Sequence, residues 1–236
     1  MSNVVYLVSG TSALNKEESY KQVEARKASA LRGRPRKLHH TAKEPIRSKE
    51  DYDKFCSYFL NLEHHAYRNY ALFVVGIELG VLRSCDLLAL TIGDVYDGKR
   101  FHDVVLGVVE KKTGKHKNVY ITEKAKKALK LYLSHRDYQS LNEPLFVSQK
   151  GNALSERQAR DILHKAAEAI KYDQPVAMHS LRKTWGYHSF VHHKNDNMAL
   201  IDVMKAYNHS NPEVTLRYIG VYEDHYRDLC NDFAVQ

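Results

Sequence analysis

Two arginines and two histidines are spaced along the chain in a way that suits phosphodiester chemistry. Arg83 lies at a junction between two expected helices, and His179 and Arg182 lie three residues apart in one turn at the start of another. His209 directly precedes a further helix. Guanidinium groups bind the non-bridging oxygens of a phosphate through forked hydrogen bonds and stabilise the charge that grows there during attack. The four residues therefore predict a site for a phosphodiester.

A tyrosine and a lysine complete this predicted site. Tyr218 ends the short helix that follows His209, where its hydroxyl could act as a nucleophile. A tyrosine has an ordinary pKa of about 10, so cationic neighbours or a base must activate it. Lys112 lies at the tip of a predicted hairpin, which can hold its ammonium over a neighbouring surface. The competing candidates are Lys115 and Lys117 for the lysine, and Tyr207, Tyr222 and Tyr226 for the tyrosine.

The sequence offers little for a metal ion. No cluster of carboxylates has the spacing of a metal site, which disfavours a two-metal nuclease. His188 and His192 are four residues apart, with His193 beside them, and such a pair on a helix can share an ion. No third ligand or carboxylate is evident nearby. We therefore expect no metal and no cofactor, and we expect His188 to pack within its helix.

Residue periodicity predicts the elements that carry these side chains. Apolar residues recur at helical spacing in most of the chain after residue 44, and two β-rich runs flank the predicted hairpin tip. Helices are predicted at 48–60, 67–79, 122–135, 155–170, 180–193, 196–207 and 210–218, and strands at 104–109 and 119–121. The predicted helix caps are Ser48, Thr122, Ser155 with Gln158, and Ser210 with Glu213. The expected fold class is mostly α with a small antiparallel β-sheet (α+β).

Length and composition indicate a globular protein. The chain has 236 residues, 43% of them hydrophobic and 27% charged, and no apolar run long enough to span a membrane. The first ten residues have no basic group ahead of their short apolar patch, unlike a secretory signal. The three cysteines form no C-x-x-C pair, which is typical of a reducing compartment. We expect a cytoplasmic location, in association with the nucleoid.

Positive charge is concentrated near the amino terminus. The formal net charge is +8, and residues 26–43 contain seven basic residues and no acidic one. We expect residues 1–43 to be a basic extension and 44–236 to be the compact domain with a carboxy-terminal tail at 219–236. Within the extension, Arg32, Arg34, Arg36 and Lys37 surround Gly33 and Pro35 in a pattern similar to an AT-hook. The alternative is a solvated basic linker with nonspecific phosphate affinity. Both interpretations predict DNA contacts from these residues. We also expect a DNA contact from Lys115.

Four stretches of the sequence together resemble the catalytic domain of the tyrosine recombinases (phage integrase family). They are Gly80–Leu90, Lys112–Lys115, His179–Thr184 and Asn208–Ser210 followed by Thr215–Gly220. They occur in the order and at the spacing of the family over residues 80–220. The resemblance implies a site-specific recombinase that cuts and rejoins double-stranded DNA through a 3′-phosphotyrosine, without metal or ATP.

The resemblance also implies a role for each residue of the phosphodiester site. Arg83 and Arg182 match the two arginines that hold the scissile phosphate. His179 matches the histidine that assists proton transfer, and His209 matches a residue that hydrogen-bonds the phosphate. Tyr218 matches the nucleophile.

Two further residues receive roles from the same resemblance. Lys112 matches the hairpin lysine that protonates the departing 5′ oxygen. Asp86 falls where the family usually has an acidic residue that supports the active site without touching the substrate.

The chain departs from the family's usual layout in one respect. Members usually carry a helical core-binding domain ahead of the catalytic domain, whereas only about 45 mostly polar residues precede it here.

The carboxy-terminal tail has two possible roles. One helical face carries Tyr222, Tyr226, Leu229 and Phe233, and this face could pack on its own domain or dock into a neighbouring subunit. Docking into a neighbouring subunit would fit a homotetramer on DNA. The competing functions are a type IB-like topoisomerase or resolvase, and a catalytically silent DNA-binding accessory protein.

Overall fold

A computed structural model describes residues 43–109, 114, 116–193, 196 and 198–232. The chain divides into two units, residues 1–41 and 42–236, and all described residues belong to the second. Its elements in chain order are α2 (Lys49–Leu60), α3 (Ala66–Glu78), α4 (Ser84–Leu88), β1 (Val104–Val109), β2 (His116–Tyr120), α5 (Glu123–Leu133), α6 (Glu156–Ala169), α7 (Met178–Val191), α8 (Ala199–Tyr207), α9 (Pro212–Ile219) and α10 (Val221–Asp232). Among the described residues, no helix combines the length and apolar character needed to cross a membrane.

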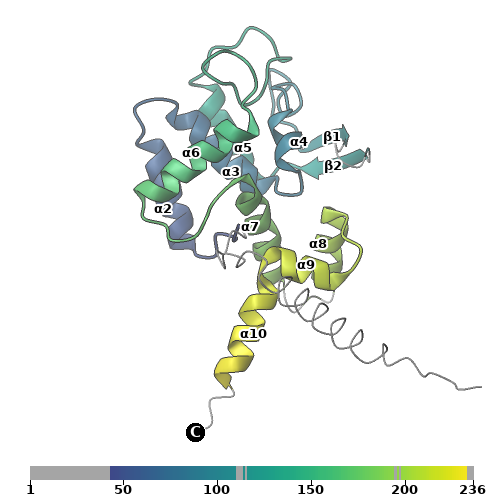
Figure 1. Ribbon diagram of the computed structural model, residues 1–236. Helices are drawn as coiled ribbons and strands as arrows, with labels where there is room; N and C mark the ends of the chain where they lie inside the picture. The colour runs from purple at the N-terminus through teal and green to yellow at the C-terminus, as the bar shows by residue number, and fades with distance from the viewer. Residues whose placement is uncertain (1–42, 110–113, 115, 194–195, 197, 233–236) are drawn as a thin grey trace, which may run out of the picture. The chain divides into compact units, whose positions relative to one another are not determined.

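The predicted fold class is confirmed, because the described elements are helices and one two-stranded antiparallel sheet (Figure 1). Helix α3 lies at the centre of the main core, and Leu72, Phe73 and Val74 at its middle are fully buried. Helices α2, α5 and α7 pack around it. Gly76 and Gly80 let α7 approach closely, because a Cβ at these positions would lie 2.6 Å and 2.4 Å from side-chain atoms of α7. This packing brings the loop after α3 to the side of α7.

Three of the four predicted helix caps are confirmed, and one is wrong. Ser48 and Thr122 accept hydrogen bonds from the backbone N–H three residues later, and Ser155 forms a capping box with Gln158. The cap of α9 is Asn211 and not Ser210, because the Asn211 side chain accepts from the Val214 N–H at 2.9 Å. The physical reason is the proline at 212, which disfavours helical backbone in the residue before it and so leaves that residue as the cap.

Two helix starts differ from the prediction. Helix α7 begins at Met178 and not at 180, because the backbone is extended at Ala177 and the Ser180 hydroxyl accepts from the Ala177 N–H. Its first turn therefore includes His179. Helix α8 begins at Ala199 and not at 196.

The predicted hairpin is confirmed and contains an irregularity. Val104 pairs with Tyr120 and Val108 with Lys117, with a register shift in β1 between Val105 and Val108. Gly107 lies in this shifted segment with a φ of +63°, which a glycine adopts without steric cost. The hairpin is tied to α8 because the Lys117 ammonium donates to the carbonyl of Ala206.

A second, smaller core lies where α7 meets α8 and α9. Val203, Tyr207 and Ile219 are buried there, with Trp185 and Tyr218 packed against them. Tyr207 is held in place because its hydroxyl donates to the carbonyl of Arg182. This core determines where α9 lies against α7.

Replacement of Gly186 by alanine is expected to lower the free energy of unfolding by about 1–3 kcal/mol, because it overpacks this second core. A Cβ at Gly186 would lie 2.5 Å from the Tyr207 hydroxyl and 2.8 Å from Cγ2 of Ile219. Denaturant titration measures the change. Ser189→Ala, in the same helix and half-exposed, is the control, and equal stability of Gly186→Ala and wild type would contradict the expected close packing.

Candidate active site

Arg83 and Arg182 come together although they lie on separate elements. Arg83 is the half-buried residue that precedes α4, and Arg182 is a buried residue of α7, 5% exposed. The Arg182 guanidinium donates from Nη1 to the carbonyl of Gly80 at 3.1 Å and also to that of Val81. Helix α7 therefore holds Arg182 against the loop that carries Arg83.

Tyr218 lies between the two histidines of the predicted site. Its ring centroid is 5.5 Å from that of His179 and 5.1 Å from that of His209, with both rings nearly perpendicular to it. The three side chains come from α9, from the first turn of α7 and from the turn between α8 and α9. The structure thus brings together residues that lie up to 39 positions apart along the chain.

The environment of the Tyr218 hydroxyl keeps its proton bound in the free protein. Burial raises the pKa of Tyr218, whereas the charge of Arg182, a side-chain hydrogen bond from Arg182 and then the charge of Arg83 lower it. The hydroxyl oxygen is buried, and its contact with Arg182 is not a well-aligned hydrogen bond. The phenol is therefore available to a substrate atom, and the arginines favour its ionised form.

His179 is in the protonation state that a proton acceptor needs. It is exposed at the surface, yet partial burial lowers its pKa, as do the charges of Arg182 and Lys183. Glu156 opposes this effect, and its carboxylate accepts a hydrogen bond from the Ser84 hydroxyl at 2.6 Å. A lowered pKa keeps the imidazole neutral near pH 7, so that it can accept a proton.

His209 is oriented by a residue of α9. Its Nδ1 lies 3.0 Å from the Thr215 hydroxyl, which in turn donates to the carbonyl of Asn211 at 3.4 Å. Because that hydroxyl uses its proton on a carbonyl, it accepts from Nδ1–H of His209. Burial lowers the pKa of His209, and Arg182 and Arg83 lower it further. A neutral His209 therefore has its Nε2 unprotonated, and protonation would make Nε2 a donor.

The competing tyrosines have different surroundings from Tyr218. Tyr207 is 1% exposed, and its hydroxyl is already used on the Arg182 carbonyl. Burial raises the pKa of Tyr207. Tyr222 and Tyr226 are exposed on α10. Among these four tyrosines, Tyr218 has its hydroxyl buried beside the arginines and not used in a well-aligned hydrogen bond within the described residues.

Several predicted residues lie outside the described ranges. They are Lys112 and Lys115 at the hairpin tip and Arg32, Arg34, Arg36 and Lys37 in the amino-terminal segment. Lys117, the remaining candidate for the hairpin lysine, is described, and its charge lowers the pKa of His209. Asp86 is buried in α4, and its backbone N–H donates to the Arg83 carbonyl at 3.1 Å.

The structure adds a cation that the sequence did not single out. Lys183 is 9% exposed, and its ammonium lies 5.5 Å from the centroid of the Tyr218 ring. Burial lowers the pKa of Lys183, whereas Glu44 raises it. Its place directly after Arg182 was visible in the sequence, but the direction in which its side chain points was not. Thr215 was missed for the same reason.

The histidines considered as metal ligands have other contacts. His188 donates from Nε2 to the carbonyl of Ile46 at 2.9 Å, since a carbonyl can only accept. Its ring lies 5.3 Å from that of His192. Within the described part of the chain, no group of three potential ligands comes together.

The sequence of the chain is similar to those of known proteins. Residues 48–225 match the model of the phage integrase family. The chain is 35% identical over 182 residues to the probable integrase/recombinase YoeC of Bacillus subtilis, and the match covers 77% of this chain and 91% of YoeC. It is 38% identical over 87 residues to the tyrosine recombinase XerC of Thermodesulfovibrio yellowstonii, over 34% of this chain and 29% of XerC.

Solved structures show the same fold. The XerA recombinase superposes with a TM-score of 0.60 at 20% identity, over 86% of this chain and 67% of XerA. The XerH recombinase bound to its palindromic difH substrate gives a TM-score of 0.60 at 20% identity, over 83% of this chain and 54% of XerH. The family match extends over most of the chain and includes every described residue of the predicted site. The chain therefore belongs to the phage integrase family and is a tyrosine-type site-specific recombinase that acts on DNA.

Proposed function

We propose that Tyr218 is the nucleophile with which this protein cuts and rejoins DNA. The observation that carries the proposal is the position of its buried, available hydroxyl beside Arg182, Arg83 and two histidines. The Tyr218 oxygen attacks the phosphorus, a 3′-phosphotyrosine forms and the 5′ oxygen leaves. Attack of a 5′ hydroxyl from another strand reverses these bonds and releases the tyrosine.

The surrounding residues bind the phosphate, accept the proton of the phenol and protonate the leaving oxygen. Arg83 and Arg182 hold the non-bridging oxygens and stabilise the charge that grows on them. Neutral His179 accepts the phenol proton. The negative charge of the bound phosphate favours the protonated form of His209, whose Nε2 then donates to a phosphate oxygen. Lys112, outside the described residues, gives a proton to the leaving oxygen. Asp86 stabilises the position of Arg83 without touching the substrate, and its backbone N–H donates to the Arg83 carbonyl.

Covalent trapping tests this proposal. The protein is incubated with nicked suicide fragments tiled across the DNA that flanks its own gene, and products that resist SDS are collected. Peptide mapping of the adduct should find the nucleotide on Tyr218. A covalent nucleotide on another tyrosine would contradict the assignment, and salt-sensitive DNA binding without any adduct would favour an accessory role.

We further propose that the protein works in the cytoplasm as a homotetramer on nucleoid DNA, assembled through α10. Tyr222, Tyr226 and Leu229 lie on one face of that helix and are 45%, 62% and 43% exposed. Three large apolar side chains at helical spacing form a surface suited to a protein partner. The basic residues of 1–43 and Lys115 would add phosphate contacts, which weaken as salt rises.

Replacement of Tyr222, Tyr226 and Leu229 by serine is expected to prevent assembly on DNA while a single subunit still binds. The reason is that each of these side chains is more than two-fifths exposed, so their loss changes the apolar surface more than the fold. A gel shift with the DNA fragment found by covalent trapping measures how many subunits bind, because each added subunit gives a slower band. Tyr120→Ser, an exposed residue of β2, is the control. An unchanged series of bands would show that α10 does not carry assembly.

A further inference from the structure

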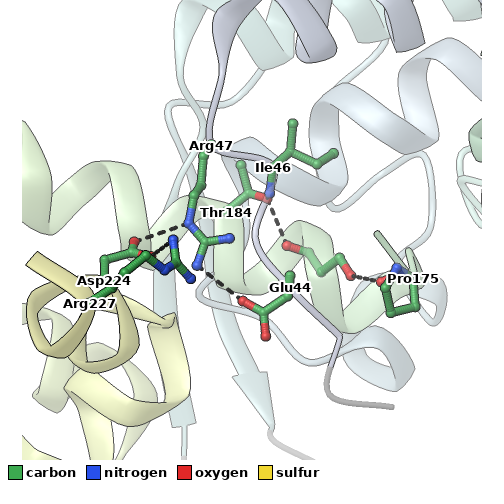
Figure 2. A network of polar contacts seen from close by, with 8 residues as sticks. Glu44, Ile46, Arg47, Pro175, Thr184, Asp224 and Arg227 are labelled. Atoms are coloured by element: carbon green, nitrogen blue, oxygen red, sulfur yellow. Dashed lines mark hydrogen bonds and ion pairs between the residues drawn. The ribbon is translucent and has the colours of Figure 1, made fainter. Parts of the chain in front are cut away.

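The segment that leads into α2, residues 44–47, lies against the turn between α9 and α10. Arg47 donates from Nε to Asp224 of α10 at 3.1 Å and from Nη2 to Glu44 at 3.1 Å (Figure 2). The side chains of Arg47, Asp224 and Glu44 are 32%, 26% and 20% exposed. Partial burial makes charge-assisted hydrogen bonds of this kind stronger than surface ion pairs. The guanidinium also lies 5.4 Å from the Tyr187 ring centroid.

The same segment is fixed to α7, the helix that carries His179 and Arg182. The N–H of Ile46 donates to the Thr184 hydroxyl at 2.8 Å, and its carbonyl accepts from His188 at 2.9 Å. Ile46 itself is fully buried. Arg47 therefore projects from a backbone that two hydrogen bonds hold on α7.

Arg47 contacts the turn between α9, which carries Tyr218, and α10. Gly220, two residues after Tyr218, ends α9 with a φ of +82°. A Cβ on Gly220 would lie 3.0 Å from Nη2 of Arg47 and 3.3 Å from Oε2 of Glu44. The charge of Glu44 also acts on Lys183, whose ammonium lies over the Tyr218 ring. The segment thus supports Tyr218 from the turn behind it and through Lys183.

We propose that Arg47 is a positioning residue for Tyr218, which holds the α9–α10 turn on α7 through Asp224. This inference rests on the proposed role of Tyr218 as nucleophile. Arg47 is not assigned a role at the phosphate, because its guanidinium lies at the Gly220 turn, where it binds Asp224 and Glu44. Loss of the ion pair frees the start of α10, and the phenol then spends less time between the histidines and arginines. Movement of α10 during assembly would act on the same contact.

Single-turnover cleavage of the trapped nicked target, at saturating DNA, tests the proposal with the full chain. Arg47→Ala and Asp224→Asn should each lower the cleavage rate roughly tenfold with an unchanged Kd, as expected for one charge-assisted hydrogen bond. The double variant should lose no more than either single variant, because both remove the same contact. Arg227→Ala is the control, since Arg227 lies 3.7 Å from the same Asp224 and is 70% exposed. Wild-type rates in both single variants, or losses that multiply in the double variant, would overturn the proposal.

A second readout needs no DNA. Hydrogen exchange of the backbone amides of 213–219 should be faster in Arg47→Ala and Asp224→Asn than in wild type and Arg227→Ala, with exchange in 49–60 unchanged. Equal exchange of 213–219 in all four proteins would contradict the role of Arg47. A wild-type protein that forms no adduct would contradict the nucleophile, while the exchange result would still decide whether Arg47 positions α9.

Discussion

Tyr218→Phe is expected to abolish the covalent protein–DNA adduct and to leave DNA binding close to that of wild type. The substitution removes one oxygen, which is the atom that bonds to phosphorus in the proposed reaction. The remaining ring keeps its contacts with His179, His209 and Lys183. The hydroxyl has no well-aligned hydrogen bond to a described residue, so its loss should change stability little. Resistance of the complex to SDS, compared with retention on a filter, measures the two effects.

Tyr222→Phe is the matched control for this experiment. Tyr222 is 45% exposed on α10, and the same change there should leave adduct formation intact. An adduct that persists in Tyr218→Phe would assign the nucleophile to another tyrosine.

Arg182→Ala is expected to lower the cleavage rate by about 10²–10³-fold, as the loss of a preorganised donor to a developing oxyanion does in other enzymes. The side chain also donates to the carbonyls of Gly80 and Val81 and lies over the Tyr207 ring. Its loss leaves two carbonyls without that donor and so also lowers stability. Single-turnover cleavage, well below the melting temperature of the variant, separates the two effects.

Arg182→Lys distinguishes charge from geometry. A lysine keeps the positive charge but has no planar fork, so it cannot reach the two carbonyls and a phosphate together. We expect it to recover stability better than cleavage. Arg160→Ala, which removes an exposed arginine of α6 paired with Asp161, is the control. Wild-type cleavage by Arg182→Ala would remove Arg182 from the proposed site.

The sequence by itself determined the features that depend on near neighbours in the chain. Apolar periodicity over one or two turns located the helices, and the caps at Ser48, Thr122 and Ser155 follow from a side chain and an N–H three residues away. The hairpin follows from two β-rich runs around a short turn. The set of candidate residues, with Arg83 and Tyr218 at its ends, came from the resemblance of four short stretches. The family itself could therefore be predicted before any contact between distant residues was known.

Tertiary structure alone decided which distant side chains meet. Arg47 and Asp224 lie 177 residues apart, and nothing in either neighbourhood predicts their ion pair. The place of Lys183 over Tyr218 and the bond between Thr215 and His209 depend on how α9 lies against α7. That packing depends in turn on Gly186, which admits Tyr207 and Ile219 at distances no side chain would allow. Helical periodicity gives the face on which a residue lies, but the partner of that face depends on the path of the whole chain.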